Sequence, residues 1–176
     1  MEAREELLTF AEVAIAIAGF SGVVGAFLQR DGLHWVDRVR FVGILGISFA
    51  AFALAFVSIV LSHLGWTGPA LWSGASVVMI VFWAVCVAPL PFVMPRLRRE
   101  DYFNSRVFAS MVAAPALLNL GLQLANAFGL LLESGVVAYL LGLFIFLYTA
   151  GVLFVIAIVF RPAEGTGVPP PEGSDS

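Results

Sequence analysis

The sequence predicts an all-α protein, a polytopic transmembrane bundle of five helices. Two observations lead to this fold class. The 176-residue chain is 61% hydrophobic with a mean hydropathy of +1.00, so its apolar surface exceeds what a small soluble core can bury. Between residues 41 and 160 it also contains four apolar stretches, each longer than the roughly 20 residues that a helix needs to cross a bilayer. Lipid is therefore the predicted solvent of one membrane domain, residues 1–162.

The first predicted helix covers residues 7–28, which are apolar except for Glu12. We expect it to span the membrane, because the basic stretch 29–40 follows it and such loops anchor spans on the cytoplasmic side. Its glycines lower helix propensity, so a re-entrant or interfacial element is the alternative. The second predicted helix covers residues 41–64 and ends at an uncharged turn rich in glycine, residues 65–69.

The remaining three predicted helices follow the same spacing of apolar stretches and polar junctions. They cover residues 70–94, 107–131 and 136–160. The long junction after the third is basic, whereas the junction between the fourth and fifth is short and carries no arginine. Residues 163–176 are rich in proline, glycine, serine and acids, a composition that predicts a disordered polar tail.

The distribution of arginine predicts the orientation of the bundle. All nine basic residues are arginines, and they concentrate in alternate junctions. Because arginine-rich loops face the cytoplasm, we expect the N-terminus outside and the C-terminus in the cytoplasm. The most basic loop is expected to contact anionic lipid headgroups, which leaves no need for a nucleic-acid partner. Its arginines are Arg96, Arg98, Arg99 and Arg106.

Small residues line the first predicted helix at intervals of three and four, which lets helix backbones approach closely. The pattern favours a helix packed centrally in the bundle or at a subunit contact, with a pore-lining helix as the alternative. The residues expected to pack are Ala14, Ala18, Gly19, Gly22 and Gly25.

Glu12 is the only acid well inside an apolar segment. An ionised carboxylate there costs about 2.5 kcal/mol or more, so it needs a partner, water or a proton. In the fourth helix Asn119, Gln123 and Asn126 recur at intervals of four and three, which places three amides on one helical face. Counting inward from the helix ends puts Gln123, Asn126 and Tyr139 near the depth of Glu12 and Asn119 closer to the midplane, so we expect one polar cluster. It serves either transport or plain helix association by hydrogen bonds.

The string Gly19-Phe20-Ser21-Gly22 matches the GxSG motif of rhomboid-type intramembrane serine proteases. The only histidine in an apolar segment, His63, lies at the far end of the second helix, roughly 15 to 20 Å from Ser21 in depth. Hydrogen-bond reach is about 3 Å, so we do not expect an enzyme. The single cysteine, Cys86, and the two histidines show no ligand spacing, and neither a metal nor a cofactor is predicted.

The strings Ala16-Ile17-Ala18-Gly19-Phe20-Ser21-Gly22 and Leu122-Gln123-Leu124-Ala125-Asn126-Ala127-Phe128-Gly129 resemble those of a group of small, uncharacterised multi-span bacterial membrane proteins. That resemblance implies a bacterial inner (plasma) membrane location. It implies no activity, and it transfers no catalytic residue.

Two functions remain open on the sequence alone. The first is a homo-oligomeric channel or conductor of protons or small ions, because five short helices hardly enclose a pore alone and the Glu12 level supplies polar groups within lipid. The second is a membrane scaffold, sensor or accessory subunit, in which the small residues and amides build protein contacts and nothing crosses. In both cases the expected partners are the lipid bilayer and further copies of the chain.

Overall fold

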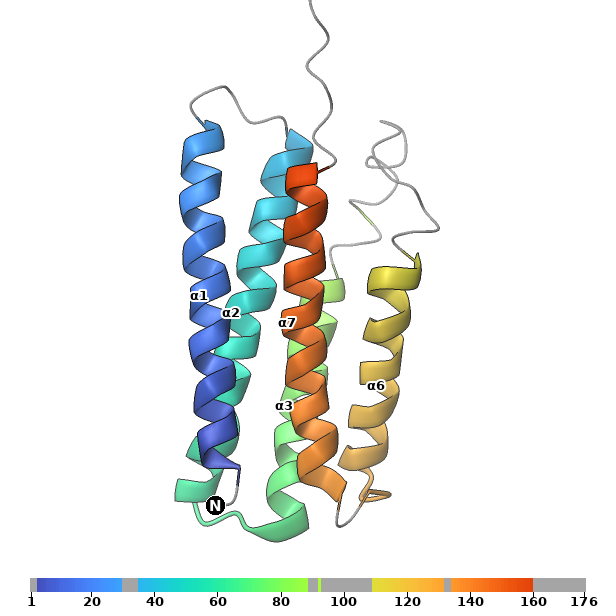
Figure 1. Ribbon diagram of the computed structural model, residues 1–176. Coiled ribbons are helices and arrows are strands. Elements are labelled where there is room, and N and C mark those ends of the chain that lie inside the picture. Colours follow the sequence, from blue (N-terminus) through green and yellow to red (C-terminus); the bar gives the residue numbers. More distant parts are fainter. Residues whose placement is uncertain (1–2, 30–34, 89–91, 93–108, 132–133, 160–176) are drawn as a thin grey trace, which may run out of the picture.

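The computed structural model describes residues 3–29, 35–88, 92, 109–131 and 134–159, and it confirms the all-α helical bundle (Figure 1). The described elements are long helices joined by turns, and no strand occurs among these residues. The helices are α1 (Arg4–Gln29), α2 (Trp35–His63), α3 (Gly68–Val87), the π-helical turn η1 (Ala109–Ala113), α6 (Ala114–Ala127) and α7 (Gly135–Val159).

Successive helices run in opposite directions along the bundle axis. The start of α1 and the α2–α3 and α6–α7 turns all lie at one end, the lower end in Figure 1. We call this the turn end. The two junctions without arginine therefore lie at the same end, as the alternation of arginine-free and basic junctions predicted.

The central helix is α7, which packs against α1, α2, α3 and α6. By contrast α1 packs against α2 and α7 and lies at one edge of the bundle, with α6 at the opposite edge (Figure 1). Of the two positions expected for the first helix, the central one is therefore not found, and a subunit contact stays a prediction. Small residues at intervals of three and four indicate close packing but not position, so α1 packs closely through one face while lying at the edge.

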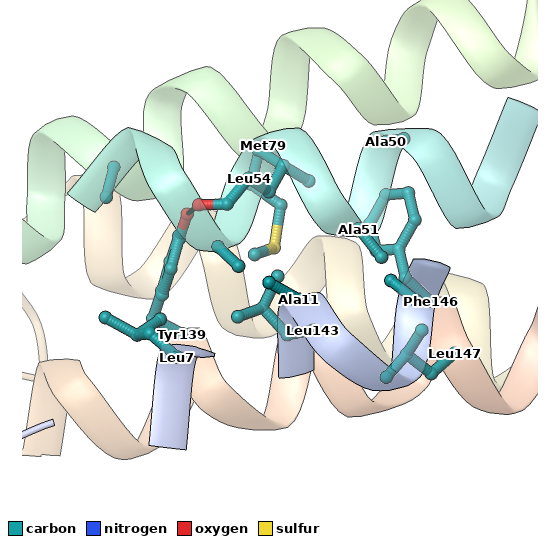
Figure 2. Close-up of a cluster of buried hydrophobic side chains, with 13 residues drawn as sticks. Leu7, Ala11, Ala50, Ala51, Leu54, Met79, Tyr139, Leu143, Phe146 and Leu147 are labelled. Carbon is teal, nitrogen blue, oxygen red and sulfur yellow. Dashed lines mark hydrogen bonds between the residues drawn. The ribbon is translucent and has the colours of Figure 1, made fainter. Parts of the chain in front are cut away.

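The main core lies between α1, α2, α3 and α7 (Figure 2). Alanines from α1 and α2, such as Ala11, Ala51 and Ala55, let those two helices approach closely, while Leu54 and Leu143 fill the space between α2 and α7. Small and large side chains thus contribute together to one close-packed core. A smaller cluster of Phe41, Ile44 and Ala157 extends the core towards the other end.

Four of these helices, α1, α2, α3 and α7, are long and apolar enough to cross a membrane. The first segment is among them, which agrees with the expected span rather than with a short interfacial element. Large apolar side chains also cover the outer surface, for example Val42, Phe49, Val81 and Phe144. Hydrocarbon is the solvent that such a surface requires, so the chain is a multi-pass membrane protein.

Helix ends differ from the predicted ones at several places. Helix α2 begins at Trp35, six residues before the expected start at Phe41, so the polar Asp37 and Arg38 belong to its first turns. Helix α6 ends at Ala127, before the predicted end at residue 131. The basic loop, the tail 163–176 and the C-terminal part of the third predicted helix, apart from residue 92, lie outside the described residues.

The two short turns close with the same hydrogen-bond pattern. After α6, the Leu130 N–H donates to the Ala125 carbonyl and the Gly129 N–H donates to the Asn126 carbonyl. Such paired bonds form a Schellman motif, which requires a left-handed residue after the helix. Gly129 supplies it with φ 73°. The pattern repeats after α2, where Gly65 has φ 87°.

Pro115 explains the irregular start of the fourth helix. Proline lacks an N–H group, so it cannot donate the main-chain bond to the carbonyl of Met111 that an α-helix requires. The residues just before it, Ala109–Ala113, form the wider π-helical turn η1. Together η1 and α6 make a shorter regular segment than the predicted 107–131.

Candidate functional site

The three predicted amides form a buried polar group on the face of α6 that packs against α3 and α7. Asn119, Gln123 and Asn126 are 1%, 1% and 3% exposed. Their spacing of four and three residues keeps them on one side of the helix, as predicted. Ser76 of α3, which is fully buried, joins them. We call Ser76, Asn119, Gln123 and Asn126 the amide cluster.

Both the nitrogen and the oxygen of the Gln123 side-chain amide form hydrogen bonds. Its Nε2 donates to Oδ1 of Asn119 at 3.1 Å and to the carbonyl oxygen of Ala138 at 2.8 Å. Its Oε1 accepts a hydrogen bond from Oγ of Ser76 at 2.7 Å. One side chain therefore connects α6 to α3 and α7, and the two N–H groups of its amide are both used.

Asn126 makes the corresponding contacts nearer the turn end. Its Nδ2 donates to Oγ of Ser76 at 2.8 Å and to the carbonyl of Gly135 at 3.0 Å, and it lies 3.4 Å from the carbonyl of Trp72. Its own main-chain carbonyl accepts from Oγ of Ser73 at 2.9 Å. The same three helices are thus joined twice within one helical turn.

Glycines of α7 bring the backbone of that helix directly onto the amide cluster. A Cβ atom on Gly142 would lie 2.5 Å from Nε2 of Gln123, 2.6 Å from Sδ of Met79 and 2.9 Å from Oδ1 of Asn119. A Cβ atom on Gly135 would lie 2.7 Å from Oδ1 of Asn126. The cluster is therefore filled by its own hydrogen-bonded atoms.

Tyr139 lies close by but has a different partner. Its hydroxyl donates to the main-chain carbonyl of Leu54 in α2 at 2.6 Å, and Figure 2 shows the ring reaching across to that oxygen. The ring also packs against Trp72 with centroids 5.8 Å apart. Tyr139 consequently ties α7 to α2, whereas the amides tie α6 to α3 and α7.

The structure does not bring Glu12 to these amides. Helix α1 buries the face that contains Ala11, Ala14 and Ala18, and Glu12 is exposed on another face. The amides are on α6, at the other edge of the bundle (Figure 1). Similar depth along the bundle axis carries no information on which helices are neighbours, and α1 and α6 lie at opposite edges. Within the part of the chain that is described, Glu12 makes no hydrogen bond or ion pair.

The small residues of α1 divide between two faces. Ala14 and Ala18 are buried against the neighbouring helices, and Gly25 lies beside the ring of Phe41, 3.7 Å from where a Cβ atom would be. Gly19 and Gly22 are exposed, and a Cβ atom on either would meet nothing within 4 Å. These two glycines therefore do not serve packing within the described chain.

Ser21 and His63 lie far apart. Ser21 is buried, and its hydroxyl has no hydrogen-bond partner among the described residues. It is 17 residues beyond Arg4, or about 25 Å from the turn end by helical rise. His63 ends α2 at the turn end, and its Nδ1 is 2.8 Å from the Ile59 carbonyl. The described ranges also contain no group of three His, Cys, Asp or Glu side chains that could hold a metal ion.

The predicted headgroup ligands Arg96, Arg98, Arg99 and Arg106 lie outside the described residues. Ser76 and the close-packed Gly142 were not predicted. Ser73 and Ser76 share a face of α3, which is a weak signal because serine is tolerated at many positions of a membrane helix.

The chain matches no protein-family model, no curated protein and no solved structure at a significant level.

Proposed function

We propose that this multi-pass membrane protein is a scaffold or accessory subunit that holds other membrane components and neither transports nor catalyses. One observation carries the proposal: the amide cluster consumes its hydrogen-bonding groups inside the chain. Gln123 bonds to Ser76, Asn119 and the Ala138 carbonyl, and Asn126 bonds to Ser76 and the Gly135 carbonyl.

The energetics of such contacts favour a structural role. A polar side chain in hydrocarbon must find a partner, and hydrogen bonds between membrane helices are each worth about 0.6 to 2 kcal/mol. Short α6, with 14 residues, has less apolar surface to bury than its neighbours. Several such bonds hold it against α3 and α7 and give a stiff body on which an exposed helix can be presented.

Gly142 supports the same reading. A conducting site needs space in which an ion or a chain of water molecules replaces protein contacts. Here the α7 backbone approaches so closely that even a methyl group would overlap Gln123 and Met79. A passage through this cluster would require α7 to separate from α6.

The proposed setting is a bacterial inner membrane with the turn end outside. The arginine-rich junctions and the C-terminal tail then face the cytoplasm, in accord with the positive-inside rule, and the basic loop meets anionic headgroups.

A homo-oligomeric conductor of protons or small ions is the second candidate, and one observation favours it. Glu12 is exposed on α1 rather than used inside the chain. Several copies arranged around an axis could line a path with this carboxylate, and intramembrane ionisable residues often mark such paths.

Flux into liposomes separates the two functions. The purified protein, the Glu12→Gln variant and empty liposomes are compared for proton and potassium flux, with a protonophore as positive control and the subunit count measured in the same lipid. If the protein is a scaffold, liposomes with the purified protein and liposomes with the Glu12→Gln variant should show only the background flux of empty liposomes. A flux that scales with protein and that Glu12→Gln alters would contradict it and establish the conductor.

A further inference from the structure

Glu12 occupies an unusual place for a charged side chain. Among the described residues of the four candidate spans it is the only acidic or basic side chain away from a span end. It follows Arg4, where the first span begins, by eight residues, or about 12 Å along the helix axis. Its side chain is exposed on α1, which lies at the edge of the bundle.

Glu12 belongs to a continuous exposed stripe, which we call the outer face of α1. Its residues recur at intervals of four and three, so they share one side of the helix. All of them are exposed, and the two glycines leave open space above the backbone. The outer face consists of Leu8, Glu12, Ile15, Gly19, Gly22 and Ala26.

Contact with lipid acyl chains is unfavourable for the outer face of α1. A carboxylate facing hydrocarbon costs about 2.5 kcal/mol or more unless it is paired. Acyl chains supply no donor to Glu12, whereas a helix in contact with Gly19 and Gly22 comes close enough for its side chains to reach the carboxylate. The carboxylate and the open glycine backbone are independent features of one face, and both are satisfied by the same kind of occupant.

We propose that the outer face of α1 docks one transmembrane helix of a different protein, and that this helix carries a lysine or arginine at the depth of Glu12. The proposal rests on the scaffold function above and names the chemistry of the partner. The basic side chain pairs with the Glu12 carboxylate, and the helix backbone crosses over Gly19 and Gly22.

Charge complementarity favours a different protein over a second copy. The chain contains no lysine, and none of its nine arginines lies at this depth in any span. A second copy packed in parallel on this face would bring Glu12 against Glu12, and like charges in a low-dielectric setting disfavour each other. A basic residue forms a charge-assisted hydrogen bond with the carboxylate, which is about twice as strong as a neutral one.

Synthetic helices test the proposal on the full-length protein. The probe is a fluorescent leucine-alanine transmembrane peptide with one lysine placed about 12 Å from its outer end, and its control has leucine there. Energy transfer from labelled protein in liposomes measures binding of each. We expect the lysine peptide to bind about tenfold more tightly, which corresponds to 1.4 kcal/mol, and Glu12→Gln to remove that difference.

Two glycine variants test the geometry. Gly22→Leu should weaken the binding of both peptides at least severalfold, because the leucine side chain fills the space above the backbone of the outer face. Gly121→Leu is the matched control, since Gly121 is also exposed with nothing within 4 Å of its Cβ position, but on α6. It should leave binding unchanged.

Equal binding of the lysine and leucine peptides would overturn the proposal. So would self-association of the full chain that depends on Glu12 and displaces the peptides, since the occupant would then be a second copy. Flux is measured separately from peptide binding. If the protein conducts ions and still prefers the lysine peptide, only the scaffold function is overturned. If it conducts no ions and shows no preference for the lysine peptide, only the docking proposal is overturned.

Discussion

At the scale of single residues, Gln123 illustrates how a polar side chain is kept in a membrane protein. Its amide contacts another side chain on its own helix, a serine on α3 and a main-chain carbonyl on α7. Removing one partner of such a set leaves the others buried without a bond, which costs about 1 to 3 kcal/mol. The amide cluster is therefore a strong joint and also a sensitive one.

Gly142 gives the sharpest prediction at this scale. Gly142→Ala should lower the unfolding free energy by about 1 to 3 kcal/mol, because the methyl group forces Gln123 or Met79 to move. Gly151→Ala on the same helix has nothing within 4 Å of its Cβ position and should stabilise by about 0.5 to 1 kcal/mol. Thermal unfolding in detergent micelles measures both. Equal shifts would mean that the cluster tolerates the methyl group.

Sequence reasoning at the residue scale succeeded where one helix was involved. Asn119, Gln123 and Asn126 share a face because of their spacing alone, and the structure buries that face. Their partners could not be predicted, because no pattern within α6 indicates which helices lie opposite. Glu12 was expected beside these amides, but depth alone does not determine which helices are neighbours, and α1 and α6 lie at opposite edges.

At the scale of elements, the two hairpins share one way of turning. Helices α2 and α6 each end in a Schellman motif whose left-handed residue is a glycine, Gly65 and Gly129. The motif satisfies carbonyls that the end of a helix would otherwise leave unpaired. Both turns could be located from glycine and charge, whereas the early start of α2 could not, because Asp37 and Arg38 are polar residues that a helix extending beyond lipid accommodates.

Gly129→Ala tests the α6–α7 turn. An alanine held at a φ of 73° costs about 1 to 2 kcal/mol, so the unfolding midpoint should fall. Gly121→Ala, in the middle of α6 with open space around it, is the control and should not lower it. The comparison is made by circular dichroism during heating. If both variants melt alike, the left-handed residue contributes nothing to stability.

At the scale of the whole molecule, the bundle has a centre and two unlike edges. Helix α7 contacts the other four helices, while α6 is fixed at one edge by the amide cluster and α1 is held at the other by small apolar contacts. The five helices followed from the apolar stretches, and the end that carries the short turns followed from the junctions between them, whereas only α1, α2, α3 and α7 are long and apolar enough to span a membrane. Which helix is central did not follow from the sequence, because all the spans are apolar enough to occupy that position.

This asymmetry gives the molecule its proposed use. The α3, α6 and α7 side is closed by polar contacts, and the α1 side offers a carboxylate and two open glycines. The proposed docking therefore depends most on how α1 is rotated about its axis. Ala14 and Ala18 face the bundle, and Glu12 and Gly19 face away from it.

Spin-label accessibility measures that rotation directly. Single cysteines are placed at each position from 11 to 22 on a Cys86→Ala background, which removes the only native cysteine, and collision with oxygen in liposomes reports exposure to lipid. The account predicts maxima at positions 12, 15, 19 and 22 and minima at 11, 14 and 18. Maxima at 14 and 18 with protection at 12 and 19 would contradict it.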